Sequence, residues 1–113
     1  MKSFIFEMTV KVSETIEKLP RGLQNKINAY LDLLQDKGHA LLFPYVDKVE
    51  GYKNLWELRP HFHNMEFRMI YFWKERTAYF VHAFEERGKK AKNQREYRTA
   101  DSIKTVILKQ LEA

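Results

Sequence analysis

A four-residue polar link between two aromatic-rich segments restricts the fold of this chain most. Residues 67–73 and 78–85 are dominated by aromatic and aliphatic side chains, a composition typical of β-strands. The sequence between them is Lys74-Glu75-Arg76-Thr77. So short a link cannot make a parallel crossover, and the two strands must therefore run antiparallel. A third strand-like segment at residues 55–59 extends the pair to an antiparallel meander.

The N-terminal segment carries two competing patterns. Apolar residues alternate with mostly polar neighbours from Phe4 to Val12, which predicts a half-buried strand. Ser13 is suited to cap a helix that would carry Ile16 and Leu19. A first strand is expected within this segment, and its boundary with the following helix stays open.

Two further helices are predicted from apolar residues three and four positions apart. The first begins near Pro20 and stops at Gly38, and the second closes the chain with Asn93 as its possible N-cap. Their apolar residues are Leu23, Ile27, Tyr30, Leu31 and Leu34, and then Ala100, Ile103, Ile107 and Leu111. The chain is therefore predicted to be α+β, with an N-terminal strand, a helical hairpin packed on a small antiparallel sheet, and a C-terminal amphipathic helix.

Size and composition favour one domain inside the cell. A chain of 113 residues matches a single domain spanning residues 1–113, and the absence of cysteine excludes disulfides and thiolate metal sites. The N-terminus mixes Lys2, Glu7 and Lys11 into its apolar residues, and no apolar run approaches ~18 residues. We expect a soluble cytoplasmic protein with no membrane partner.

Positive charge is concentrated in the second half of the chain. Residues 1–50 carry seven basic and seven acidic side chains, whereas residues 51–113 carry thirteen and eight, so the net charge of +5 belongs to the second half. The densest part is a basic cluster opposed only by Glu96: Arg87, Lys89, Lys90, Lys92, Arg95 and Arg98. Such a cluster can hold an RNA backbone without reading its sequence. A solvated loop is the alternative.

Three motifs carry a family resemblance. They are Leu55-Trp56-Glu57-Leu58-Arg59, then Phe67-Arg68-Met69-Ile70-Tyr71, then His82-Ala83-Phe84 followed by Lys89-Lys90. This order resembles the phage-derived, HigB-like branch of the RelE/ParE toxin superfamily. The resemblance implies a RelE-like fold and the toxin of a type II toxin–antitoxin system. It also implies a ribosome-associated messenger RNA endoribonuclease that needs no metal or other cofactor. The expected partners are messenger RNA, the ribosome and a small antitoxin. The antitoxin is expected to be a helix-turn-helix protein, and operator DNA would be bound only through it.

Two arginines are the candidate phosphate cations. By the superfamily pattern, Arg68 matches the strand arginine that contacts the scissile phosphate, and its planar fork suits two phosphate oxygens. The alternative is an ordinary arginine on the strand surface. Arg59 is the second candidate cation. Its alternative role is an ion pair with Glu57 or Glu66.

Two other residues are candidates for proton transfer. His82 is the only histidine in an apolar strand, and an ordinary pKa of ~6.5 suits proton transfer near neutrality. A hydrogen-bonded core histidine is the alternative. Tyr97 and Ala100 form a Tyr-x-x-Ala pattern that resembles the RelE-like C-terminal segment, whose tyrosine takes part in proton transfer.

The turn length decides whether Arg68 and His82 meet, because side chains alternate between the faces of a strand. A turn of two or four residues pairs Tyr71 with Phe80 and Met69 with His82, which places Arg68 on the opposite face from His82. A turn of three residues would place them on one face. Both outcomes stay open from sequence alone.

Two other patterns have a structural and a chemical interpretation. The strand aromatics Tyr71, Trp73, Phe80 and Phe84 could stack on bases, but core packing is the preferred prediction. The pair His61 and His63 resembles a metal motif, yet no cysteine or carboxylate lies at ligand spacing, so no metal is expected.

The rival to the nuclease is a non-catalytic nucleic-acid- or protein-binding module of the same fold, or a gyrase-directed toxin of the ParE type. It is retained because Glu57 stands where many RelE-like strands carry lysine. No single residue in the sequence is an obvious general base.

Overall fold

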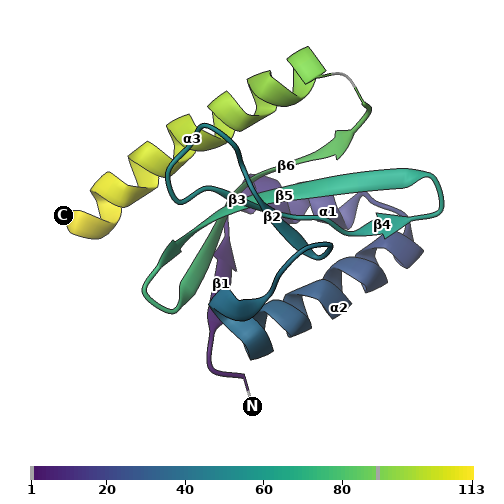
Figure 1. Ribbon diagram of the computed structural model, residues 1–113, viewed down its shortest axis with the longest axis horizontal. Coiled ribbons are helices and arrows are strands. Elements are labelled where there is room, and N and C mark those ends of the chain that lie inside the picture. Colours follow the sequence, from purple (N-terminus) through teal and green to yellow (C-terminus); the bar gives the residue numbers. More distant parts are fainter. Residues whose placement is uncertain (1, 89) are drawn as a thin grey trace.

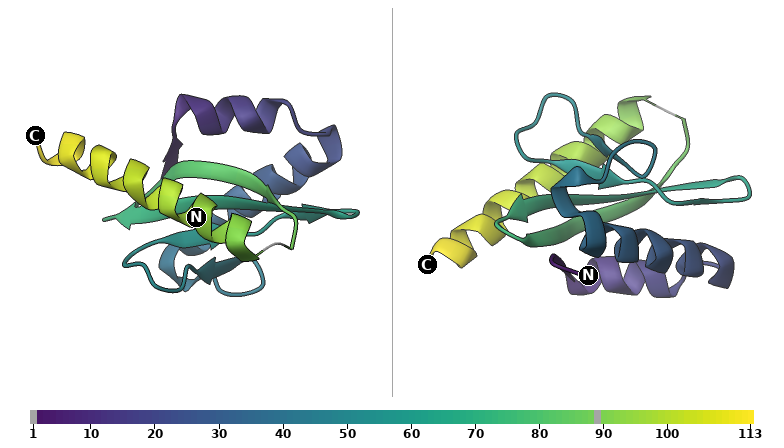
Figure 2. Two further views of the ribbon diagram at one scale, coloured as in Figure 1. Left: turned by 90° about the horizontal axis from the view of Figure 1, so that it is seen from above. Right: turned by 60° about the horizontal axis from the view of Figure 1, so that its bottom comes forward.

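The computed structural model describes residues 2–88 and 90–113, which form a sheet between two helical layers. The described strands have the order β1-β6-β5-β3-β2, with β4 paired to β5. They are β1 (Ile5–Met8), β2 (Val46–Lys48), β3 (Trp56–Leu58), β4 (His61–Phe62), β5 (Met65–Lys74) and β6 (Thr77–Glu86). The helices are α1 (Val10–Glu17), α2 (Arg21–Lys37), the short 3-10 helix η1 (Gly38–Ala40) and α3 (Lys90–Glu112). Figures 1 and 2 show α1 and α2 on one side of the sheet and α3 on the other.

The antiparallel meander is confirmed, but the complete sheet is mixed. Strand β5 pairs antiparallel with both β3 and β6, and only Glu75 and Arg76 separate β5 from β6. Strand β1 adds to the outer edge of β6 in parallel, with Ile5 beside Thr77. The predicted antiparallel sheet is therefore extended by one parallel pair, which is possible because a long stretch of chain, not a tight turn, separates β1 from β6.

The first helix begins earlier than predicted. Strand β1 ends at Met8, and the Thr9 side chain accepts a hydrogen bond of 3.2 Å from the Val12 amide. Ser13 lies inside α1, so its predicted role as N-cap is wrong. Thr9 provides the hydrogen-bond acceptor that the Val12 amide would otherwise lack at the start of the helix. The side chain of Val12 is then buried in the core.

The boundaries of α2 agree with the predicted start near Pro20 and stop at Gly38. Pro20 precedes the helix and Gly38 follows it with a φ of 54°, in the region that favours glycine. A Cβ at Gly38 would collide with the ring of Phe4, so this position needs glycine for space as well.

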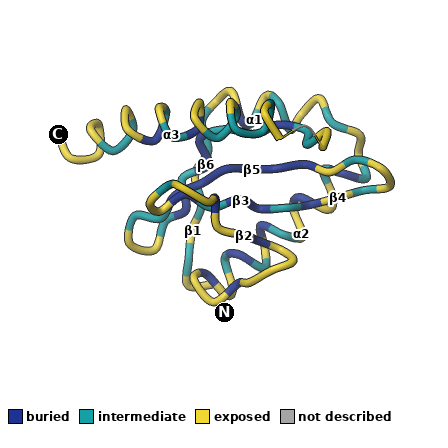
Figure 3. Tube along the Cα trace, turned by 45° about the horizontal axis from the view of Figure 1, so that its top comes forward, coloured by how far each residue is buried: buried dark blue, intermediate teal, exposed yellow. Residues whose placement is uncertain are grey.

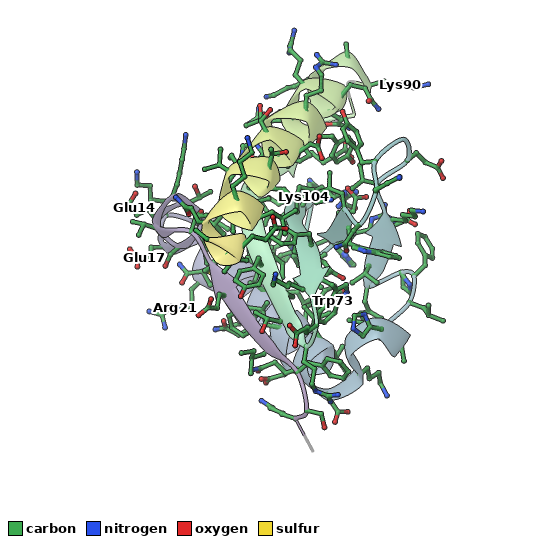
Figure 4. All side chains as sticks on the ribbon, turned by 90° about the vertical axis from the view of Figure 1, so that its left-hand side faces the viewer. Glu14, Glu17, Arg21, Trp73, Lys90 and Lys104 are labelled. Atoms are coloured by element: carbon green, nitrogen blue, oxygen red, sulfur yellow. The ribbon has the colours of Figure 1, made fainter. Side chains whose placement is uncertain are left out.

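The closing helix α3 starts at Lys90, three residues before the predicted cap. Asn93 therefore lies inside α3, where its Nδ2 donates a hydrogen bond of 3.2 Å to Glu86 instead of capping. Lys104 anchors the middle of α3, and its buried ammonium donates to the backbone carbonyl of Lys53 (Figure 4). Beyond that anchor the end of α3 is exposed (Figure 3), and none of the described helices has the length and apolarity to cross a membrane.

Two apolar cores lie on opposite faces of β5, whose residues 67–72 are all buried (Figure 3). The α1/α2 core contains Tyr71 and Phe80, and the α3 core contains Phe84. Trp73 packs against the edge of the first core. Core packing of the strand aromatics, the preferred prediction, is confirmed.

A β-bulge in β6 decides which side chains share a face. The turn has two residues, and Tyr71 pairs with Phe80 as predicted for an even turn. Val81 is then left without a partner, so the next pairs are Ile70 with His82 and, further along, Arg68 with Phe84. The predicted pair of Met69 and His82 is therefore wrong. Arg68 and His82 lie on one face, toward α3, despite the even turn.

Candidate functional site

A cavity of about 340 Å³ lies where the sheet meets the beginning of α3. It brings together three of the predicted catalytic residues, Arg59, Arg68 and Tyr97, with Lys90 of the basic cluster. Its full lining is Glu57, Arg59, Arg68, Glu86, Gly88, Lys90, Asn93, Gln94 and Tyr97. We call it the phosphate cavity, because the guanidinium groups of its two arginines have the charge and shape that suit phosphate oxygens. In Figure 4, Lys90 marks this end of α3, far from Arg21 at the start of α2.

Arg68 is held inside the phosphate cavity by three carboxylates. Its guanidinium nitrogens lie 3.9 Å from Glu57, 3.5 Å from Glu66 and 3.7 Å from Glu86, and Nη1 also donates a hydrogen bond of 3.1 Å to the carbonyl of Phe67. Only 5% of the residue is exposed, so the alternative of an ordinary surface arginine is wrong. A buried guanidinium requires such partners. They fix its fork at the cavity wall.

Arg59 forms the neighbouring part of the wall. Its Nε lies 3.7 Å from Glu57 and its Nη1 lies 3.7 Å from Asp47. The ion pair with Glu57, which is the predicted alternative role of Arg59, is therefore present. The buried Nε has no hydrogen-bond partner in the described part of the chain. An unsatisfied buried donor costs roughly 1–3 kcal/mol, and the ion pair with Glu57 offsets part of that cost.

Glu57 and Tyr97 form a hydrogen-bonded acid–base pair. The Tyr97 hydroxyl donates to Glu57 Oε1 at 2.6 Å. Burial raises the pKa of Glu57, against the opposing effects of the Tyr97 hydrogen bond and of Arg68 and Arg59. Burial, together with the neighbouring Glu57, raises the pKa of Tyr97. The carboxylate is therefore a stronger base than usual, and the phenol keeps its proton.

The sequence predicts Glu57 only as an ion-pair partner of Arg59 and as an acidic residue where many RelE-like strands carry lysine. The sequence does contain a signal for Glu57. Adjacent residues of a strand point to opposite faces, so Glu57 must face away from the side that Trp56 and Leu58 share. Its pairing with Ile70 places it on the α3 face beside Arg68. The partner strands that bury it could not be assigned from the segment alone.

Glu86 organises the turn between β6 and α3. Its Oε1 accepts hydrogen bonds from the Asn93 side chain and from the Gly88 amide. These bonds lower the pKa of Glu86, mainly through Asn93, so the carboxylate stays ionised beside Arg68. The two carboxylates of the phosphate cavity thus differ, one easily protonated and the other not.

His82 shares a face with Arg68 but does not line the phosphate cavity. Its Nε2 lies 3.4 Å from Glu96 of α3, and its ring stacks on Phe84 with centroids 6.0 Å apart. Glu96 immediately precedes Tyr97. The structure therefore places His82 where it can position the helix that carries Tyr97.

The basic cluster is divided by the structure. Lys90 lines the phosphate cavity, whereas Arg87 pairs with Glu85 at 3.3 Å. Arg95 and Arg98 are exposed along α3, Lys92 is half-buried, and Lys89 lies outside the described residues. From Lys90 onward the cluster is helical rather than a loop.

In residues 2–88 and 90–113, no three His, Cys, Asp or Glu side chains are grouped so that they could hold a metal ion. Within the suspected histidine motif, the ring of His63 packs on Phe62 with centroids 4.1 Å apart. His61 lies in β4 at the rim of a different pocket.

The fold is similar to that of known toxins. A mutant of the E. coli toxin RelE in the free state superposes with a TM-score of 0.62 at 11% identity, covering 88% of this chain and 95% of that one. The archaeal RelE–RelB complex from Pyrococcus horikoshii gives a TM-score of 0.56 at 21% identity, covering 79% of this chain and 99% of that one. No curated protein matches the sequence. These likenesses show a RelE-like fold. The family described as phage-derived protein Gp49-like (DUF891) matches residues 14–105, and the chain therefore belongs to this phage-derived, HigB-like family.

Proposed function

We propose that this chain is the toxin of a type II toxin–antitoxin system and that it cleaves messenger RNA on the ribosome without a metal. The observation that carries the proposal is one cavity lined by two arginines, a lysine and a hydrogen-bonded Glu57–Tyr97 pair. Cleavage by an adjacent ribose 2′-oxygen needs a base, an acid and cations around the phosphorane. The phosphate cavity offers a residue for each requirement.

In the proposed reaction, Arg59 and Arg68 bind the non-bridging oxygens of the scissile phosphate. The Glu57 carboxylate accepts the proton of the 2′-hydroxyl as the 2′-oxygen attacks phosphorus. Tyr97 donates its proton to the departing 5′-oxygen, which leaves a 2′,3′-cyclic phosphate and a 5′-hydroxyl. The proton held by Glu57 then returns to Tyr97 across their 2.6 Å hydrogen bond. Both residues end in their starting states.

The phosphate must compete with the carboxylates that already contact Arg68. Glu66 is the easiest to displace, because half of its side chain is exposed, whereas Glu57 is almost completely buried. A phosphodiester carries one negative charge, as Glu66 does, but it can present two non-bridging oxygens to the Arg68 fork, whereas Glu66 contacts Nη1 alone. We therefore expect the contacts of Arg68 with Glu57 and Glu86 to remain in place.

The exposed part of the basic cluster would hold the substrate. Arg87, Lys90, Arg95 and Arg98 are exposed at or near the beginning of α3. Contacts from such residues to an RNA backbone or to the ribosome depend on charge alone, and they weaken as salt is added. They would bring RNA to the phosphate cavity without selecting its sequence.

One observation favours a second candidate, a non-catalytic nucleic-acid- or protein-binding module of the same fold, including a gyrase-directed toxin of the ParE type. Two arginines, Arg59 and Arg68, are contacted by four carboxylates, from Asp47, Glu57, Glu66 and Glu86. A fully paired arginine can serve a structural role alone.

Controlled expression in growing bacteria separates the candidates. We expect expression of the chain to arrest growth and to leave cleaved messenger RNA, and Arg68→Ala to abolish both effects. Arg21→Ala is the matched control, because Arg21 is exposed at the distant start of α2 and should not matter (Figure 4). Growth arrest with intact messenger RNA would contradict the nuclease and support the binding module.

We also propose a cognate antitoxin, a small helix-turn-helix protein through which alone operator DNA is bound. Membership of a HigB-like family supports this, as does the crystallised complex of a structural relative with RelB. The product of the neighbouring reading frame should co-purify with this chain and restore growth. An adjacent gene product that does neither would contradict the pairing.

A further inference from the structure

A smaller pocket shares a wall with the phosphate cavity. It measures about 180 Å³ and is lined by Tyr30, Phe43, Pro44, Arg59, His61 and Glu66. Arg59 lines both spaces, and the Glu66 carboxylate lies 3.5 Å from the Arg68 guanidinium. The smaller pocket, here called the side pocket, therefore adjoins the phosphate cavity at Arg59.

Two aromatic side chains, Tyr30 and Phe43, line the side pocket. Phe43 is 67% exposed as a residue, and the Arg59 guanidinium lies over its ring, 5.0 Å from the ring centroid. Tyr30 packs edge-on against Tyr45 with centroids 5.2 Å apart. Burial raises the pKa of Tyr30, so its hydroxyl keeps a proton to donate. Aromatic faces and arginine planes beside a phosphate site are the surfaces on which unpaired RNA bases stack.

We propose that the side pocket binds one nucleobase of the RNA strand whose phosphate lies between Arg59 and Arg68. This inference rests on the proposed function and adds a specificity site to it. Pockets for drug-sized ligands enclose roughly 300–1,000 Å³, so 180 Å³ suits a single flat ring system. The base stacks on Phe43, and its edge faces the hydroxyl of Tyr30 and the carboxylate of Glu66.

The polar edge of the side pocket predicts which bases fit. An ionised carboxylate only accepts hydrogen bonds, so Glu66 favours a base that presents an amino group. Adenine, cytosine and guanine present one, whereas the donor of uracil, N3–H, stands between two carbonyl oxygens that repel a carboxylate. The side pocket is therefore selective against uracil at the nucleotide it receives.

Binding can be measured apart from cleavage with a fluorescent five-nucleotide RNA that is 2′-O-methylated throughout, since it lacks the attacking hydroxyl. A series of the same RNA with one abasic position each identifies the nucleotide that needs its base. We expect Phe43→Ala to weaken binding of the intact RNA about tenfold. It should change binding of the critical abasic RNA less than about twofold, because no ring is left to stack. Phe43→Trp should restore the intact affinity.

Leu42→Ala is the matched control. Leu42 is the adjacent residue and is 71% exposed, but it does not line the side pocket, so its removal should leave the affinity unchanged. Equal thermal unfolding of the two alanine variants would show that neither disturbs the fold. The proposal is overturned if the RNA does not bind, if every abasic RNA binds as tightly as the intact one, or if Phe43→Ala weakens all of them equally.

The outcomes also separate this inference from the proposed function. Base-dependent binding through Phe43 by a protein that never cleaves messenger RNA would support the side pocket and contradict the nuclease. Cleavage that requires Arg68, together with binding that ignores every abasic position, would support the nuclease and contradict the side pocket.

Discussion

The two faces of the central sheet use the same strands for different purposes. The face toward α1 and α2 is closed by apolar side chains such as Leu23, Ile27 and Met69. All three buried charged residues of the described chain, Glu57, Arg68 and Lys104, belong to the side that α3 covers. Alternation along a strand thus lets neighbouring residues serve stability and chemistry separately. Two helices close one face, whereas one helix leaves room for a charged cavity on the other.

The largest expected difference is between Arg68→Ala and Met69→Ala, adjacent residues on opposite faces. Arg68→Ala should lower the cleavage rate about 10³-fold, because a cation beside the phosphorane is lost. Met69→Ala should instead lower the free energy of unfolding by about 2–5 kcal/mol through the cavity that it leaves. Cleavage of ribosome-bound messenger RNA and urea unfolding measure the two effects. A folded Met69→Ala protein as inactive as Arg68→Ala would break the division between the faces.

Tyr97→Phe tests the proton transfer on the α3 face. We expect the rate to fall about 10²-fold, while the ring keeps its contact with Phe84 and the free energy of unfolding changes by about 1 kcal/mol or less. Loss of the hydrogen bond also raises the pKa of Glu57 further, so the acid limb of the pH–rate profile moves to higher pH. Tyr79→Phe is the control, since Tyr79 stacks on Phe72 away from the phosphate cavity. Equal losses in the two variants would rule out a specific role for Tyr97.

The two carboxylates of the phosphate cavity should affect stability with opposite signs. Above the ordinary pKa of 4.5, unfolded Glu57 is ionised while folded Glu57 still holds a proton, so the free energy of unfolding falls as pH rises toward its folded pKa. For Glu86, the unfolded chain binds the proton first as pH falls below 4.5, so stability is lost toward acid. Urea unfolding of Glu57→Gln and Glu86→Gln across the acidic range should remove one dependence each. The same slope change in both variants would contradict this assignment.

The smallest expected effect is that of His82→Gln. His82 contacts α3 through Glu96 and lies outside the lining of the phosphate cavity, so we expect the rate to fall less than about tenfold and the free energy of unfolding by roughly 0.5–1 kcal/mol. A loss of 10² or more would identify His82 as the proton-transfer residue that its strand position first indicated. Comparing the loss of cleavage rate in His82→Gln with that in Tyr97→Phe therefore shows which of the two residues transfers the proton.

The elements that could be predicted from sequence are those whose ends are marked by nearby residues, such as proline, glycine or a short polar link. Pro20 and Gly38 bound α2, and the short link bounds the β5–β6 hairpin. The parallel pairing of β1 depends on an edge of β6 distant in the chain, which no local pattern reports. Strands β2 and β4 have three and two residues, too few for an alternating pattern. Two residues suited to cap α1 stand four positions apart, and only packing chooses Thr9 over Ser13.

The site was predictable to a similar degree. The sequence motifs predict Arg59, Arg68 and Tyr97 as site residues, and the structure places all three around one cavity; their roles stay predictions. The residue that joins them, Glu57, became apparent only when the sheet register showed its face. The position of His82 likewise depended on the bulge at Val81, since an even turn alone predicts the other face.

The bulge at Val81 also has a consequence for the order of assembly. The hairpin closes at a two-residue turn, and the short loop makes the pairs from Lys74–Thr77 to Tyr71–Phe80 the least costly to form. The ladder is interrupted at Val81, and we expect the pairs beyond it, which position Arg68 and Glu86, to form later than those near the turn. We expect the amides of this distal half to exchange with solvent sooner than those near the turn. A nascent chain would thus acquire its stable core before the side chains of the phosphate cavity are aligned.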